Sequence, residues 1–346
     1  MEIKDDFKGN HPFYNPFDVM SFSYNKCFLC GGLLKDEGSI EHVFPKWLQN
    51  EYELWDQTIS LLNGTTISYR KLTIPCCQSC NIKYLSVLEN AIKLHHEKGY
   101  SEFLKLDKFR IYRWITKIFY GLLFKELSLL TDQTDPKQGP ITSPKLLEEF
   151  KTLHGFLQSI RFPFRFMDFH PWSIFVVETH AYGDKRDFDY HDGIFTLTFS
   201  IRMGGIGVIA CLEDNGAQEA MFSEYFDKFR GIKLHPLQFD ELAAKVTYKS
   251  SLMNRVPKYI SVLPKGKKQE VTVTSLPLHG FSSKSIFDDW DNRTYARLLA
   301  HYWQKWAIRF TDIFKEPNLV LSLTENEDRT VKVLDPNGNI AGNYKE

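Results

Sequence analysis

Two cysteine pairs, each with two residues between the thiols, are the feature of this chain that most limits how it can fold. They are Cys27-Phe-Leu-Cys30 and Cys77-Gln-Ser-Cys80. Two such pairs can surround one zinc ion tetrahedrally and leave no position open for a substrate, so we expect a structural zinc. Cysteines with this spacing in an intracellular type of chain favour zinc over disulfides. The ion would close the long loop between the pairs and fix the residues inside it.

That loop contains Ile40-Glu41-His42-Val43-Phe44-Pro45, and the second cysteine pair runs into Asn81-Ile-Lys83. Together with the cysteines, these residues resemble the HNH endonuclease family in its cysteine-bearing form. Glu41-His42 with Pro45 is similar to the family's acid-His-x-x-Pro element, and Cys77 to Lys83 is similar to its Cys-x-x-Cys-Asn-x-Lys element. The resemblance covers about residues 25–95 and implies a ββα-metal core, a two-stranded hairpin followed by a helix.

The family's reaction is metal-dependent hydrolysis of DNA phosphodiester bonds, which leaves a 5′ phosphate and a 3′ hydroxyl. It needs a deprotonated water, a cation at the phosphate and a stabilised leaving oxygen. His42 is suited to be the general base because an imidazole titrates near neutral pH. Glu41 and Asn81 would offer hard oxygen ligands to magnesium or manganese, and Glu89, about two helical turns beyond Asn81, could add a carboxylate. On a regular strand Glu41 and His42 would point to opposite faces.

One element of the family pattern is missing. The family usually places an Asn about five residues before the second cysteine pair, where this chain has Lys71-Leu-Thr73. We expect either Asn63, in an Asn-Gly turn, or the hydroxyl of Thr73 to replace it. The departure leaves open a zinc-stabilised module that binds nucleic acid or protein and whose hydrolytic site has decayed. An RNA-directed nuclease toxin is a third reading and differs only in substrate.

Charge and length constrain the rest of the chain. The 43 Lys and Arg residues equal the 43 Asp and Glu residues, so any nucleic-acid contact must come from local patches. Helical spacing of apolar residues predicts a helix over 101–130. Its other face is basic, and that face either lies in solvent or contacts a DNA backbone: Lys105, Lys108, Arg110, Arg113 and Lys117. The turn formers from Thr131 to Pro144 predict a linker.

Beyond residue 144 the pattern changes to strands and short helices. We expect strands at 172–178, 194–201, 207–212, 259–263 and 270–275, and helices at 217–229 and 236–247. Gly204 to Gly207 predicts a bulge or a close backbone approach, since a phosphate loop would need a helix to follow. A late helix over 292–314 carries Arg297, Lys305 and Arg309 on a slowly spiralling stripe, which predicts contact with phosphates, a partner or solvent.

The sequence thus predicts an α+β protein of two domains. Residues 1–100 would form a ββα-metal nuclease domain with structural zinc, 101–144 a connecting helix and linker, and 145–346 a mixed domain that selects substrate or partner. Lys83 would add a nucleic-acid contact. We expect DNA as partner, a cytoplasmic location and no membrane span, because no apolar run is long enough and the N-terminus lacks signal-peptide features. Architecture alone suggests an effector of anti-phage defence or restriction with a second protein component; the oligomeric state stays open.

Overall fold

The structure is a computed structural model, and it describes residues 13–340 with several gaps. The gaps are 19–21, 35–39, 128, 133, 140, 142–147, 264–269 and 279–283. Contacts within the chain divide it into two compact units. Unit 1 comprises Met1–Glu97, Leu106–Met167 and Tyr259–Thr274, and unit 2 comprises Lys98–Lys105, Asp168–Lys258 and Ser275–Glu346. Both units mix helices with small sheets, so the expected α+β class is confirmed.

Unit 1 is built around a short antiparallel strand pair followed by helices. β1 (Ile40–His42) pairs with β4 (Thr73–Pro75), with Glu41 opposite Ile74 and His42 opposite Thr73. The chain between these strands forms α1 (Lys46–Glu51), the hairpin β2 (Thr58–Ser60) and β3 (Thr66–Ser68), and η2 (Tyr69–Lys71). After β4 come α2 (Gln78–Cys80), the π-helical turn η3 (Asn81–Leu85) and α3 (Ser86–Glu97). The order is strand, strand, helix.

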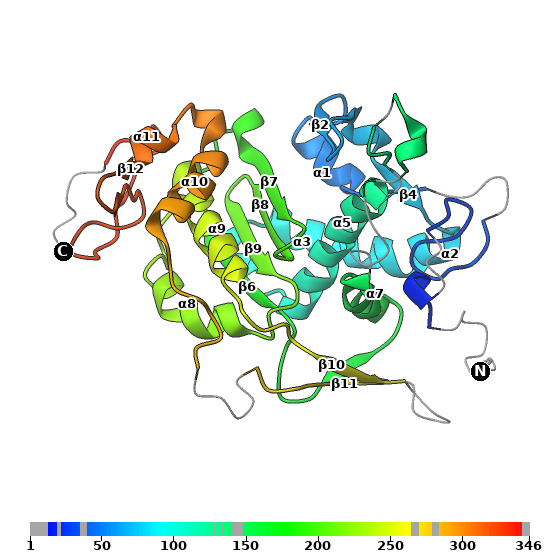
Figure 1. The fold of residues 1–346 in the computed structure, drawn as a ribbon. Coiled ribbons are helices and arrows are strands. Elements are labelled where there is room, and N and C mark those ends of the chain that lie inside the picture. Colours follow the sequence, from blue (N-terminus) through cyan, green and yellow to red (C-terminus); the bar gives the residue numbers. More distant parts are fainter. Residues whose placement is uncertain are drawn as a thin grey trace. The chain divides into compact units, whose positions relative to one another are not determined.

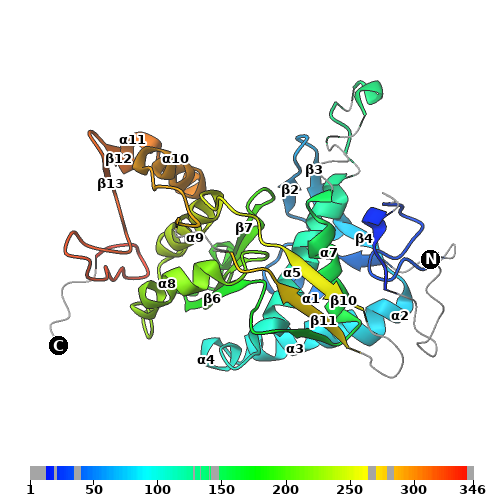
Figure 2. The same cartoon turned by 60° about the horizontal axis from the view of Figure 1, so that its bottom comes forward.

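The predicted helix over 101–130 is two helices, α4 (Tyr100–Phe103) and α5 (Lys108–Leu127). α5 begins after Asp107, whose side chain accepts a hydrogen bond from the Phe109 amide at 3.1 Å and whose carbonyl accepts one from the Arg110 amide. Most of α5 is buried, including Trp114 and Ile118. It therefore forms the core of unit 1 together with α3 and β4 (Figure 2), whereas the sequence had predicted a connector.

The expected boundaries at residues 100 and 144 also differ from the observed units. α7 (Lys151–Leu157), η5 (Gln158–Ile160) and β5 (Phe164–Phe166) belong to unit 1. β5 pairs in parallel with β11 (Val271–Ser275), which lies beside β10 (Tyr259–Val262) (Figure 2). The predicted linker lies partly outside the described residues. In its described part, the amide of Ile141 donates to the Leu129 carbonyl and closes a loop against unit 1. Unit 1 also contains η1 (Pro16–Asp18) and η4 (Pro136–Gln138).

Unit 2 is a four-stranded antiparallel sheet with helices packed on it (Figure 1). The strand order is β6 (Ser173–Glu178), β9 (Ile206–Cys211), β8 (Thr198–Met203) and β7 (Phe188–Gly193). α9 (Pro236–Ser251) packs on β8 and β9, and α8 (Ala217–Asp227) and α10 (Asn292–Tyr302) complete the layer. A Cβ at Gly207 would lie 2.5 Å from the Phe239 ring, so the expected close approach is a helix approaching the sheet. η6 (Lys185–Asp187) precedes β7.

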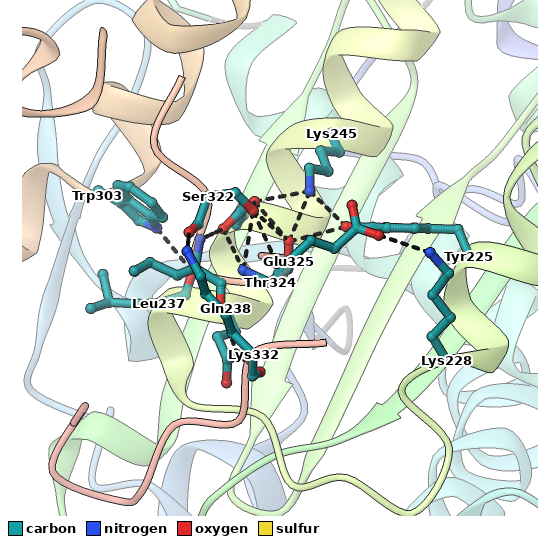
Figure 3. Close-up of polar contacts among 12 residues, drawn as sticks. Tyr225, Lys228, Leu237, Gln238, Lys245, Trp303, Ser322, Thr324, Glu325 and Lys332 are labelled. Atoms are coloured by element: carbon teal, nitrogen blue, oxygen red, sulfur yellow. Dashed lines mark hydrogen bonds and ion pairs between the residues drawn. The ribbon is translucent and has the colours of Figure 1, made fainter. Parts of the chain in front are cut away.

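A buried carboxylate on α9 anchors the C-terminal segment of unit 2 (Figure 3). Glu241 is fully buried and accepts from Ser322 Oγ at 2.6 Å, from the Leu323 amide at 2.6 Å and from Thr324 Oγ1 at 2.8 Å. Figure 3 labels Ser322 and Thr324 among these partners. Its charge is balanced by Lys245, whose ammonium lies 2.9 Å away. Every oxygen of this carboxylate therefore has partners, as a buried charge requires.

The predicted helix over 292–314 ends at Tyr302. Ala307 then adopts a left-handed backbone with φ 56°, which breaks the helical path. The remaining elements are η7 (Gln304–Trp306), α11 (Phe310–Ile313), β12 (Phe314–Lys315) and β13 (Leu319–Val320). None of the helices in the described part of the chain is both long enough and apolar enough to cross a membrane.

Candidate functional site

Four thiols meet in unit 1. The Sγ atoms of Cys27, Cys30, Cys77 and Cys80 all lie within 4.8 Å of one another, and the Cys30 and Cys77 sulfurs are 3.7 Å apart. A tetrahedral zinc site with bonds of about 2.3 Å separates its sulfurs by about 3.8 Å, whereas a disulfide would bring them to about 2 Å. None of the four is in a disulfide. The donor set and its spacing fit a metal ion such as zinc.

The close packing of the four thiols also changes their pKa values. Hydrogen bonding to Cys27 raises the pKa of the Cys30 thiol to about 12, and raises the pKa of Cys80 further. Cys27 takes the negative charge for the group, because hydrogen bonds from Cys30 and its neighbours lower its pKa. Four thiolates cannot coexist at this distance without a positive ion between them. Cys76 is buried beside the cluster, with its Sγ 3.5 Å from the Cys77 carbonyl.

Side chains of α7 and η5 form hydrogen bonds with the turn that carries the first cysteine pair. His154 contacts the Phe28 carbonyl through Nε2 at 3.0 Å, and Gln158 donates to the Leu29 carbonyl at 2.9 Å. The Phe28 amide in turn donates to the Pro75 carbonyl of β4 at 2.8 Å. These buried bonds fix the turn against the strand pair and thereby present Cys27 and Cys30 toward the second cysteine pair.

The acid of the Glu-His pair is tied to a lysine that the sequence had placed on a basic face. Lys117 of α5 is completely buried, and its ammonium lies 2.6 Å from Glu41 Oε1 and 2.8 Å from Glu89 Oε1. It also donates to the carbonyls of His42 and Val43, at 2.6 and 3.1 Å. Burial alone would lower the pKa of Lys117, but the two carboxylates reverse this and raise it. The basic face predicted for this helix therefore ends before Lys117.

The two acids share one counter-charge. Burial raises the pKa of Glu89 to about 7, with Lys117 opposing and Glu41 reinforcing the shift. Near neutral pH one carboxyl group of the pair can therefore hold a proton, and the three groups together approach neutrality. The expected proximity of Glu89 to Glu41 is present, but an ammonium lies between them.

His42 faces a different environment from Glu41. Its ring stacks on Trp55 with the centroids 5.7 Å apart, and its backbone pairs with Thr73. Burial and the nearby Lys46 lower the pKa of His42, while Glu41 raises it. A neutral imidazole at pH 7 can accept a proton, which is what a general base requires.

The third predicted site residue begins the helical part of the motif. Asn81 is the first residue of η3, and its Oδ1 accepts from Ser86 Oγ at 3.4 Å. Lys83 is exposed two residues later. Of the two proposed substitutes for the missing Asn, Asn63 is occupied elsewhere, because it bonds the Thr65 amide and the Leu130 carbonyl. Thr73 lies directly across the strand pair from His42 and is the better candidate.

The residues expected to bind magnesium or manganese do not form a ready cation site. The Oε1 atom of Glu41 is bound to Lys117, and among the described residues the groups of three or more His, Cys, Asp or Glu side chains suited to a metal do not include Glu41 or Glu89. A divalent cation at Glu41 would have to displace a buried ammonium that already has four oxygen partners. The arrangement as it stands does not fit a hard metal.

The basic residues predicted in the late helix lie on separate elements of unit 2. The guanidinium of Arg297 in α10 is 5.9 Å from the Phe310 ring, and Arg309 precedes α11 with its Nε 3.4 Å from Asp312. Lys305 in η7 pairs with Asp189 and, at 3.1 Å, with Asp240. No continuous stripe remains, because the helix that would carry it ends at Tyr302.

The sequence missed a second polar cluster, which surrounds Lys305. Asp189, His191 and Asp240 place their ligand atoms within 4.8 Å of one another. Asp189 and His191 alternate along β7, a strand that was not predicted, and the alternation of its side chains was the signal that could have found it. Since Lys305 already pairs with both carboxylates, the cluster contains its own counter-charge.

The chain was compared with known proteins. No protein-family model matches it, and neither a curated protein nor a solved structure gives a match.

Proposed function

We propose that unit 1 is a zinc-stapled nuclease unit of the HNH type that hydrolyses phosphodiester bonds of DNA. The observation that carries the proposal is the antiparallel pair of β1 and β4, which presents Glu41-His42, followed by a helical segment that begins at Gln78 and includes Asn81. The thiol cluster supports it, because one cysteine pair precedes β1 and the other lies directly after β4, where the helical segment begins. Zinc there would hold the element together and leave the chemistry to other residues.

His42 is the residue we assign as general base. Its neutral ring could take a proton from a water molecule attacking the phosphorus, and the stacked Trp55 keeps the ring in one orientation. We assign Lys117 a positioning role. Its ammonium donates to the His42 carbonyl and pairs with Glu41, and these two contacts hold β1 in place. Magnesium or manganese, if recruited, would supply a positive charge at the phosphate, and Glu41 would have to leave Lys117 to bind it.

Cleavage of plasmid DNA by the full chain tests the proposal. We expect nicking or cutting in magnesium or manganese, and a loss of about a hundred- to ten-thousand-fold in His42→Ala with zinc content unchanged. His95→Ala is the matched control, since His95 lies on α3 of the same unit and only contacts the Ala91 carbonyl. Equal cleavage by both variants would refute the assignment. The same assay with RNA of identical sequence separates the toxin reading from the DNA nuclease.

A second function is favoured by the position of Lys117. If its ammonium permanently occupies the place between Glu41 and Glu89, unit 1 is a zinc-stabilised module that binds nucleic acid without cutting it. Tight DNA binding by the wild type with no cleavage in any divalent metal would select this function. Action in anti-phage defence with a second protein is a further part of the proposal, and it rests on analogy of architecture.

A further inference from the structure

Unit 1 contains a pocket of about 210 Å³ with cations along its wall. Its lining comes from η3 and α3 on one side and from α5 and η5 on the other: Lys83, Tyr84, Val87, Leu88, Ala91, Arg110, Arg113 and Ile160. Three of these side chains are positively charged and none is acidic. The lining thus combines apolar side chains with three basic ones.

The cations of the pocket form no ion pairs with any described residue. In the described part of the chain, Lys83 and Arg110 form no ion pair or hydrogen bond through their side chains, and the buried Nε of Arg113 has no hydrogen-bond partner. The Arg113 guanidinium lies over the Phe109 ring, 3.8 Å from its centroid, which holds it in place. Burial lowers the pKa of Arg113, Asp107 raises it and Arg110 lowers it. An unpaired and partly buried guanidinium is costly, so the arrangement is suited to a bound anion.

We propose that this pocket binds a phosphate group of the nucleic-acid backbone next to the cleavage site. A guanidinium presents a planar fork of donors that matches two phosphate oxygens, and Arg113 contributes its guanidinium to the lining of the pocket. The apolar part of the lining would contact the sugar, and it has no polar group that could bind another ion: Val87, Ala91 and Ile160. This inference rests on the proposed function, because it takes the ligand to be the substrate of unit 1.

Residues of the pocket lie on the same two helices, α3 and α5, as Glu89 and Lys117. Arg113 precedes Lys117 on α5 by four residues, about 6 Å along the helix axis. On α3, Leu88 lines the pocket and its neighbour Glu89 contacts Lys117. Lys83 follows Asn81 by two residues in η3. One strand held in the pocket is therefore close enough to the Glu41-His42 segment for its neighbouring nucleotides to reach it.

Salt-dependent binding by the full chain tests the pocket. We would measure binding of labelled single- and double-stranded DNA in a His42→Ala background, without chelator, and compare Lys83→Gln/Arg110→Gln with Lys71→Gln/Lys93→Gln. Both doubles remove two positive charges from unit 1, but Lys71 and Lys93 lie outside the pocket lining. The pocket double should lose about 1.4 to 1.8 units of the slope of log K against log salt, and the control double should keep the parent slope. Equal slopes in the two doubles would overturn the pocket.

Three further measurements distinguish a backbone phosphate from other anions that could bind the pocket. Arg113→Lys keeps the positive charge but loses the paired donors of the guanidinium. The slope of log K against log salt should therefore be unchanged, while the affinity for DNA falls roughly tenfold. Stronger competition by polyglutamate than by inorganic phosphate at equal ionic strength, lost in the pocket double, would assign the pocket to an acidic polypeptide and overturn the backbone as its ligand. Cleavage is read in chains with His42 intact. If DNA binding depends on the pocket but the chain does not cleave DNA, the proposed function is refuted and the phosphate pocket stands. If the chain cleaves DNA but the two double variants have equal slopes, the phosphate pocket is refuted and the proposed function stands.

Discussion

Replacing Lys117 by methionine tests whether the buried ammonium holds unit 1 together. The substitution keeps the volume of the side chain and removes a charge that contacts Glu41, Glu89 and the carbonyls of His42 and Val43. Removing one partner of a buried ion pair costs about 3–5 kcal/mol, because the other partner is left as an uncompensated charge. Since Glu89 already has a pKa of about 7, it can take a proton cheaply, and we expect the lower end, about 3 kcal/mol at pH 8.

The loss should depend on pH with a definite sign. Lys117 opposes the rise of the Glu89 pKa, so its removal lets that pKa rise further above the ordinary value. A carboxyl group whose pKa is raised by folding stabilises the fold below its unfolded pKa and loses this contribution as pH rises through the folded pKa. Lys117→Met should therefore be most destabilised relative to wild type at pH 8 and should recover toward pH 5.

Thermal unfolding of the full chain between pH 5 and 8 provides the assay. For a unit of this size about 3 kcal/mol lowers the melting temperature by about 6–12 °C. Lys93→Met is the control, because Lys93 forms only an exposed pair with Glu97 and should change stability by less than about 0.5 kcal/mol. Adding Glu89→Gln to Lys117→Met should restore part of the loss, since it removes one stranded charge. A pH-independent loss, or none, would refute the reasoning.

Three other perturbations follow from the structure. Cys30→Ser should leave the full chain without stoichiometric zinc by elemental analysis and should melt unit 1, because three thiolates cannot hold the ion as four do; retained zinc would contradict this. Glu241→Ala should destabilise unit 2 by about 3–5 kcal/mol by denaturant titration, because it strands buried Lys245 and frees the segment at Ser322 to Thr324. Burial raises the pKa of Asp214 to about 6, so the stability of wild type relative to Asp214→Asn should fall by roughly 2 kcal/mol from pH 4 to pH 7, measured by the same titration.

The motifs of unit 1 were predictable because they are local. The spacing of the cysteines predicted the cluster of four sulfurs, and Glu41-His42 was expected on a strand, where β1 places both residues. The strands and helices of unit 2 were predictable for the same reason, since β6, β9, α8 and α9 begin and end within a few residues of the expected ranges. Periodicity and turn residues decide such elements.

The units themselves were not predictable from local pattern. β10 and β11 were expected as strands, but their pairing with β5, about a hundred residues earlier, places them in unit 1. α5 was read as a connector because its Lys and Arg residues suggested a solvated face. Burial is decided by what packs on a helix, and the partners of α5 come from α3, β4 and α7, which no window of the sequence contains.

Lys117 shows why the surroundings of Glu41 were harder to predict than the cluster of four thiols. A lysine on a helix face has the same sequence signature whether it lies in solvent or is paired inside the protein, and lysines are rarely buried without a partner. Here the partners are Glu41, 76 residues earlier, and Glu89, 28 residues earlier. The motif therefore identifies the acid but not its counter-ion. Whether Glu41 serves a divalent metal or a lysine depends on a residue outside the motif, and that is the difference between a nuclease and a binding module.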